Sequence, residues 1–216
     1  MNVGGHVEVA RRLHPGRPLV WLGAALPDLA AMGGFRLLGH TTNTAVEKGI
    51  TLHHRTDEAF HRHPHFTEPM GRLRAVLATD GISRGPARAV SHVGPELLLD
   101  GELLREPVLD DSVTNAFDCI TGSDDELGSL VLDEHREPWL IHLAKVPTWG
   151  LPTDYADPAA IARRLHRILA RRPRLAFDSE HVEAIEHRLS VEQTAIVATA
   201  PELLDDLEHE LSVSAD

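Results

Sequence analysis

The sequence is poor in cysteine, in aromatic residues and in long apolar runs, and each shortage excludes a class of protein. Its 216 residues include one cysteine, Cys119, which excludes a disulfide framework and the cysteine-rich zinc and iron–sulfur sites. Aromatic residues make up only 4%, so the core must be built from aliphatic side chains. The longest apolar stretch, residues 19–32, is too short to span a bilayer, and the first residues lack the pattern of a signal peptide. We therefore expect a cytoplasmic, soluble protein with no membrane segment.

Positive charge is also scarce. The 21 lysines and arginines face 33 acidic residues, and the formal net charge is −12. A phosphate backbone requires a basic surface, so nucleic acid is excluded as the main partner. The single basic run, residues 163–174, is either a solvated face paired with acids of the C-terminal helices or a patch that steers a phosphorylated substrate.

Histidine, by contrast, is abundant, with 15 residues, and several of them cluster with acids in the segment 49–64, GITLHHRTDEAFHRHP. His53, Asp57 and His61 are four residues apart, so on a helix they form one stripe. His54 lies about 100° further round the helix and is not fully part of this stripe. Two imidazoles on either side of a carboxylate indicate a metal site, whereas the alternative is a solvated helix face.

A second stripe with the same spacing follows in residues 91–104. His92, Glu96 and Asp100 are again four apart, although Pro95 predicts a kink or a break in this helix. Two helices that each present a histidine and carboxylates can together build a metal site in an all-helical protein.

Two further candidate ligands lie nearer the N-terminus. Asp28 follows Pro27 inside an apolar stretch, where an unpartnered acid would carry a large desolvation cost. It is therefore either a ligand or the cap of a helix that Pro27 interrupts. His6 is either a buried core histidine or a ligand.

The periodicity predicts an all-α protein with no strand of useful length. We expect a metal-site half over residues 1–105 and a helical C-terminal half over residues 106–216, packed as one domain overall. Asp157 and Pro158 mark one helix start, and Ser190 with Gln193 forms a capping box for the last helix. The expected helices span residues 1–13, 19–32, 43–63, 66–79, 86–104, 112–121, 124–133, 139–146, 159–171, 178–189 and 191–211.

Three stretches of the sequence carry a family resemblance. MNVGGH at the start, GAALPD ending in Asp28, and the ungapped segment 49–64 resemble the acyl carrier protein phosphodiesterase family, which is related to the HD-type metal-dependent phosphohydrolases. The chain departs from the family pattern at His54, at His61, and in the later helix, where His92, Glu96 and Leu97 replace two acids and a histidine. The resemblance covers about the first half of the chain.

The resemblance implies an HD-like fold and hydrolysis of a phosphodiester, which in the family releases 4′-phosphopantetheine from a carrier protein. Because carrier proteins are acidic like this chain, we expect a small phosphoester in preference to the carrier itself. A His and carboxylate set suits Mn²⁺, Fe²⁺ or Zn²⁺ better than Mg²⁺ or Ca²⁺. His54 or His61 is the expected general acid for the leaving group. The expected metal ligands are His6, Asp28, His53, Asp57, His92 and Glu96.

Two other functions stay open at this point. A helical His and carboxylate site with two irons can activate O₂ instead of hydrolysing a substrate. The chain could also be a non-catalytic helical module whose ligand positions have decayed, as Leu97 in place of a histidine suggests.

Overall fold

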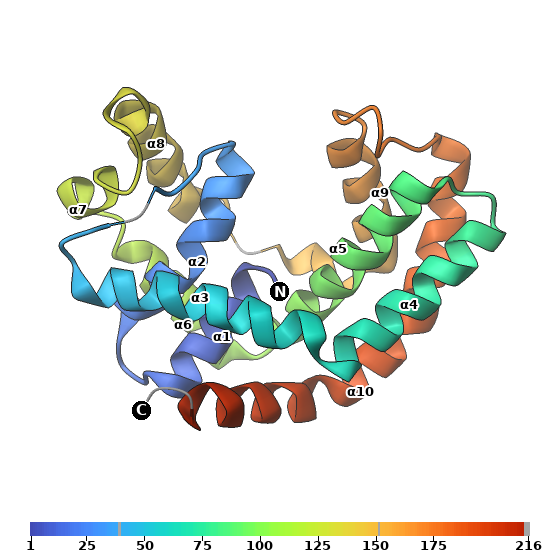
Figure 1. Cartoon of the computed structure of the whole chain (residues 1–216), viewed down its shortest axis with the longest axis horizontal. Coiled ribbons are helices and arrows are strands. Elements are labelled where there is room, and N and C mark those ends of the chain that lie inside the picture. The colour runs from blue at the N-terminus through green and yellow to red at the C-terminus, as the bar shows by residue number, and fades with distance from the viewer. Residues whose placement is uncertain (39, 151, 214–216) are drawn as a thin grey trace. The chain divides into compact units, whose positions relative to one another are not determined.

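The computed structural model describes residues 1–38, 40–150 and 152–213. Every regular element within these residues is a helix, which confirms the predicted all-α class (Figure 1). None of the helices in the described part of the chain is long and apolar enough to cross a membrane.

The chain divides into two compact units. The first comprises the described residues of Met1–Ala59, Leu103–Leu151 and Leu207–Asp216, and the second those of Phe60–Glu102 and Pro152–Asp206. Each unit draws on residues from both sides of the division that we expected between residues 105 and 106.

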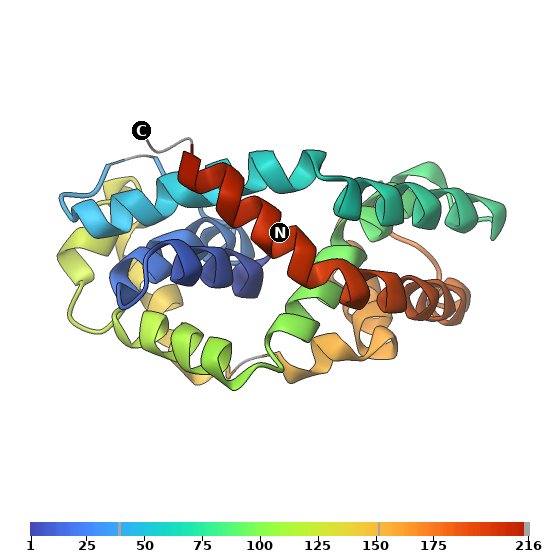
Figure 2. The same ribbon diagram turned by 90° about the horizontal axis from the view of Figure 1, so that it is seen from below.

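The first unit is built around three packed helices, α1, α2 and α6 (Figure 2). Helix α2 has buried residues on all sides, as its apolar sequence predicts. The elements of the first unit are α1 (Val3–Leu13), α2 (Pro18–Gly33), most of α3 (Thr44–Arg62), α6 (Pro107–Asp118), α7 (Asp124–Gly128), α8 (Asp133–Lys145), the short 3₁₀ helix η1 (Val146–Thr148) and the last residues of α10.

Helices α2 and α3 of this unit touch through their backbones at Gly23 and Gly49. A β-carbon built at Gly49 would collide with the backbone oxygen of Val20 and lie 2.7 Å from the amide nitrogen of Ala24. A β-carbon at Gly23 would likewise collide with the backbone oxygen of Val46. Only glycine at both positions permits this approach, and it brings the carbonyl groups of α2 within reach of α3 side chains.

The second unit contains α4 (Pro64–Thr79), most of α5 (Arg84–Leu103), η2 (Thr153–Ala156), α9 (Pro158–Leu169), η3 (Ser179–His181) and most of α10 (Val182–Val213). Arg188 on α10 donates two hydrogen bonds of 2.8 Å to the carboxylate of Asp80 at the end of α4. This paired contact fixes the end of α4 against α10.

The helices that begin at Pro158 and Pro64 have clear physical causes, although only the first of these starts was predicted. Asp157 accepts a 2.9 Å hydrogen bond from the backbone nitrogen of Ala159, which confirms the predicted cap with Pro158 in the first helical position. Pro64 ends α3 as expected, but it also begins α4, because the imidazole of His63 caps that helix through the backbone nitrogen of His65. His63 is thus a structural residue.

The prediction of two C-terminal helices was wrong, since α10 is continuous from Val182 to Val213. Ile185, Leu189 and Ile196 are buried on one face of this helix, with Glu192 buried between them, and this packing outweighs the local capping signal. The side chain of Gln193 donates to the backbone oxygen of Ala156 instead of capping a helix.

Three other boundaries also differ from the prediction. Residues 106–111 were expected to form a linker, but α6 begins at Pro107, which occupies the first helical turn. Helix α7 is shorter than the predicted 124–133, and α8 begins before the predicted 139–146.

Internal prolines do not break their helices. Helix α2 runs through Pro27, and α5 runs through Pro95. Since α2 is not interrupted, Asp28 does not cap a new helix.

The arginines at the start of the basic run pair with nearby acids. Arg163 lies 3.7 Å from a carboxylate oxygen of Asp157, and Arg164 lies 3.4 Å from one of Asp154. These partners precede α9 in the sequence, whereas we expected acids of the C-terminal helices.

The contact between α2 and α3 generates a stability prediction. Gly49→Ala should lower the free energy of unfolding by about 1–3 kcal/mol or more, because the new methyl group meets backbone atoms that cannot rotate away. The matched control is Gly71→Ala on the exposed face of α4, where a β-carbon meets nothing within 4 Å. That variant should gain about 0.5–1 kcal/mol from helix propensity. Urea unfolding of both variants would check this, and equal stabilities would contradict the close approach.

Candidate metal centre

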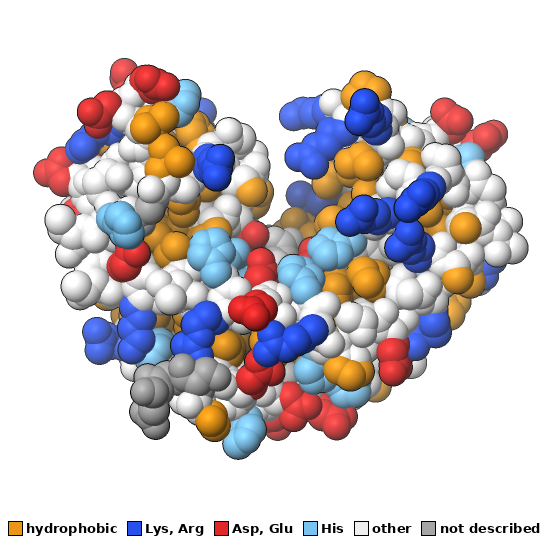
Figure 3. Space-filling model, in the orientation of Figure 1, with side chains coloured by type: hydrophobic (Ala, Val, Ile, Leu, Met, Phe, Trp, Pro, Cys, Tyr) orange, Lys and Arg blue, Asp and Glu red, His pale blue; other side chains and the backbone are white. Residues whose placement is uncertain are grey.

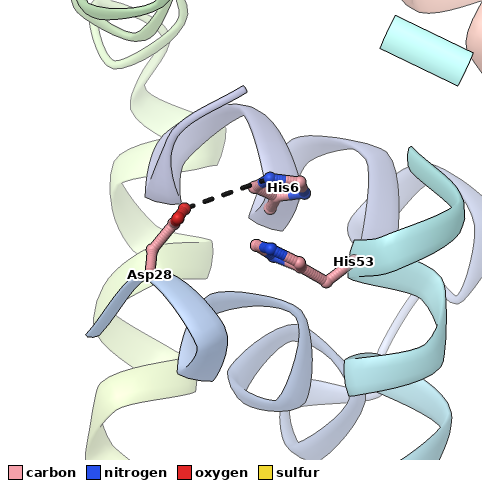
Figure 4. Close-up of side chains that lie close together, drawn as sticks. All are labelled: His6, Asp28 and His53. Atoms are coloured by element: carbon pink, nitrogen blue, oxygen red, sulfur yellow. Dashed lines mark ion pairs between the residues drawn. The ribbon is translucent and has the colours of Figure 1, made fainter. Parts of the chain in front are cut away.

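Four of the predicted ligands converge in the first unit. His6 comes from α1, Asp28 from α2 and His53 from α3 (Figure 4). Asp57 lies one turn after His53 on the same face of α3. His6, Asp28 and His53 each offer one potential ligand atom, and these three atoms all lie within 4.8 Å of one another. The two imidazole rings are stacked, with centroids 3.8 Å apart and planes inclined by 25°.

Asp57 completes the group. Its Oδ1 lies 3.2 Å from Nε2 of His6, and its Oδ2 lies 3.5 Å from Nε2 of His53. The second distance confirms that the four-residue spacing stacks His53 and Asp57 on one helix face. The N-terminal amino group of Met1 also lies 3.2 Å from Oδ1 of Asp57.

The proton on His53 is placed by the backbone of α2. Its Nδ1 lies 2.8 Å from the carbonyl oxygen of Ala24, one residue after the close contact at Gly23. A carbonyl oxygen can only accept, so in the neutral ring Nδ1 carries the proton and Nε2 carries the lone pair. That lone pair lies beside the carboxylate of Asp57. A histidine whose other nitrogen donates to a backbone carbonyl is the usual arrangement of a metal-ligating imidazole.

Burial keeps His53 neutral. The side chain is 5% exposed, and burial, together with the neighbouring His6, lowers the pKa of His53 to about 3. Asp57 and the Ala24 carbonyl oppose this shift but do not outweigh it. The imidazole lone pair is therefore available at neutral pH, which metal binding requires.

The carboxyl group of Asp57 stays ionised. Burial raises its pKa, but the contact with His6, the amino group of Met1 and the contact with His53 outweigh burial and hold the pKa well below its usual range. The centre therefore offers an anionic oxygen and a neutral nitrogen side by side.

The four side chains differ in their access to solvent. The side chains of His6 and His53 are 0% and 5% exposed, whereas those of Asp28 and Asp57 are 24% and 32% exposed. The two imidazoles are thus shielded from solvent, whereas the two carboxylates are partly accessible to it.

His61 of the first stripe meets His92 and Glu96 of the second stripe in the second unit, whereas Asp100 is buried and is not part of this group. Nε2 of His61 lies 3.1 Å and Nε2 of His92 lies 3.5 Å from Oε1 of Glu96. The two rings are stacked with centroids 5.0 Å apart. Glu96 is 8% exposed, and although its burial raises the pKa, the hydrogen bond with His61 contributes to a pKa below the usual range.

The expected ligands therefore fall into two groups, one in each unit. His61 shares the helix of His53 and Asp57, but its carboxylate partner is Glu96. His54 is exposed, with its ring edge-on to that of His53 at 5.3 Å between centroids. Leu97 is buried in the core.

Sequence reasoning missed the carbonyl of Ala24, which orients His53. A backbone atom leaves no residue signature, and the paired glycines at 23 and 49 are the only signal that could have indicated it.

The chain is therefore an all-helical protein with a cluster of histidines and carboxylates in each of its two units. Comparison of the chain with family models, with curated proteins and with solved structures gave no match.

The low pKa of His53 predicts how the metal-free protein responds to acid. The unfolded chain binds a proton at this residue below about pH 6.5, whereas the folded protein does so only near pH 3. Stability should therefore fall as pH decreases from about 6.5, by up to about 1.4 kcal/mol per pH unit from this residue. Asp57 acts in the same direction only at lower pH, below about 4.

His53→Gln keeps a side-chain donor for the Ala24 carbonyl but cannot titrate. Urea unfolding between pH 4.5 and 7.5 should show a shallower loss of stability for this variant than for the wild type. His54→Gln, an exposed neighbour, should keep the wild-type slope. If His53→Gln also keeps that slope, the protonation of His53 in the fold is not as described.

Proposed function

We propose that this protein is a metal-dependent hydrolase that acts on a phosphoester, with its metal centre at His6, Asp28, His53 and Asp57. The observation that carries the proposal is the orientation of His53. Its Nδ1 is committed to the Ala24 carbonyl, so its Nε2 lone pair lies beside the ionised carboxylate of Asp57. Two electron-rich groups held together in a buried site favour a cation between or beside them.

The donor set indicates the kind of metal. Two imidazole nitrogens and two carboxylates suit Mn²⁺, Fe²⁺ or Zn²⁺, whereas Mg²⁺ and Ca²⁺ prefer oxygen shells. Such a metal, when bound, supplies a nucleophilic water at neutral pH and offsets charge on phosphoryl oxygens. The chain's own residues hold the site: Ala24 fixes the ring of His53, and the stacked ring of His6 restrains it from the other face.

The substrate class is supported by the sequence resemblance of the segment 49–64 to acyl carrier protein phosphodiesterases. The net charge of −12 favours a small phosphoester over an acidic carrier protein. His54 is the general-acid candidate on the same helix, since it is exposed and adjoins His53.

The first test is metal content. Protein stripped with a chelator, reloaded with Mn²⁺, Fe²⁺ or Zn²⁺ and desalted should retain metal in the wild type. Asp57→Asn preserves the shape of the side chain but removes its charge, and should weaken metal binding by about 100-fold or more. Glu58→Gln changes an exposed acid next to it on α3 and should bind as the wild type does. Equal metal retention in Asp57→Asn and wild type would refute the assignment of the centre.

The second test is hydrolysis. The metal-loaded wild type should hydrolyse bis(p-nitrophenyl) phosphate or p-nitrophenyl phosphate, and Asp57→Asn should reduce kcat/KM by at least about 100-fold. Glu58→Gln should retain full activity. If the protein binds metal at this centre but hydrolyses neither ester, the proposed hydrolase activity is wrong and only the metal site stands.

One observation favours a second function. His6, His53 and Asp28 form a group of two histidines and one carboxylate, which is the ligand type of non-haem Fe(II) enzymes that activate O₂. Anaerobic loading with Fe²⁺ followed by exposure to air distinguishes the two functions. Oxygen uptake with a new visible absorption band, absent in Asp57→Asn, would favour oxygen chemistry over hydrolysis.

A further inference from the structure

A pocket of about 230 Å³ opens in the second unit beside the His61, His92 and Glu96 cluster. Its volume would hold several water molecules, at about 30 Å³ each in the liquid. Helix α4 and helix α5 supply most of its wall. The lining residues are His61, Phe66, Met70, Arg74, Arg88, Ser91 and His92.

The charge of this pocket is opposite to that of the chain. Arg74 and Arg88 are both exposed, and neither guanidinium group makes a hydrogen bond or ion pair with any other described residue. The neighbouring Arg72, by contrast, donates to Glu192 and lies 3.9 Å from Glu68. Glu68 and Glu192 pair with Arg72, and the positive charges of Arg74 and Arg88 have no carboxylate partner among the described residues.

A carboxylate, that of Glu96, engages both histidines of the pocket. Glu96 contacts both His61 and His92 through Oε1 and does not line the pocket. Figure 3 shows basic side chains (Lys or Arg) gathered over α5, with hydrophobic side chains among them. In a protein with a net charge of −12, these two arginines give one small pocket a local positive charge.

Another part of the pocket wall is apolar. Phe66 packs edge-on against both imidazoles, with ring centroids 5.3 Å from His61 and 5.4 Å from His92. Met70 lies beside it in the pocket wall and adds a flexible apolar side chain. The pocket thus combines two guanidinium groups with an aromatic and thioether surface.

We propose that this pocket binds a small phosphate monoester, whose dianionic phosphate contacts Arg74 and Arg88 and whose organic part lies against Phe66 and Met70. Guanidinium groups bind phosphate oxygens with paired hydrogen bonds, and two of them match the two charges of a monoester. The site lies within the second unit and does not depend on the metal centre of the first. It therefore stands whether or not the protein is a hydrolase.

Calorimetric titration with phenyl phosphate, inorganic phosphate and benzoate tests the proposal. The protein is stripped with chelator and carries Asp57→Asn, so the metal centre of the first unit does not contribute. We expect saturable binding of phenyl phosphate, weaker binding of inorganic phosphate because it lacks the ring, and the weakest binding of benzoate because it carries one charge.

Four variants in the same background locate the site. Arg74→Gln and Arg88→Gln should each weaken phenyl phosphate binding by about tenfold or more, and the double variant should abolish it. Arg171→Gln removes the same charge from an exposed position of the same unit outside the pocket and should bind normally. Far-UV circular dichroism checks that the folds are equal.

Two results would overturn the proposal. One is equal affinity in the double variant and in Arg171→Gln, which would indicate a general charge effect or another site. The other is binding that appears only with metal and an intact Asp57, which would assign the phosphate to the metal centre. Tighter binding of benzoate than of phenyl phosphate would change the ligand class to a carboxylate.

Discussion

The backbone contact between Gly23 and Gly49 is the constraint on which the candidate centre depends. With no β-carbon at either position, α2 and α3 approach until a methyl group at Gly49 would meet the backbone of Val20 and Ala24. The Ala24 carbonyl then accepts the Nδ1 proton of His53, one turn along α3. A larger separation of the helices would lengthen this hydrogen bond and free the imidazole to rotate. Gly23 and Gly49, which carry no side chain, therefore determine the orientation of His53 and the position of its proton.

The centre that results is an expensive arrangement for a fold without a ligand. A neutral, buried imidazole presents a lone pair to an ionised carboxylate, and the second imidazole stacks on the first. Burial of polar groups destabilises a fold unless each group finds a partner. Here the contact of Asp57 with His6 and with the amino group of Met1 offsets part of that cost. A bound divalent cation would stabilise all four side chains at once, which is the physical reason for the proposal of a metal site.

Much of the fold and part of the site could be predicted from the sequence. Hydrophobic periodicity identified the helices, and the spacing of His53 and Asp57 placed them on one face. The apolar surroundings of Asp28 marked it as a candidate ligand. Local signals failed where tertiary packing decides. The predicted capping box at Ser190 does not start a new helix, because α10 continues through it. His61 lies on the same stripe as His53 but contacts Glu96. The orientation of His53 depends on a backbone oxygen 29 residues away, which no side-chain pattern encodes.

The measurement that tests the central claim most directly is anomalous diffraction from a crystal of the protein grown with Mn²⁺ or Zn²⁺. We expect a strong anomalous peak for a metal ion bound to Nε2 of His53, with His6, Asp28 and Asp57 as its other protein neighbours. Nδ1 of His53 should still donate to the carbonyl oxygen of Ala24. A fully ordered centre with no anomalous peak, or a metal bound through Nδ1 of His53, would contradict it.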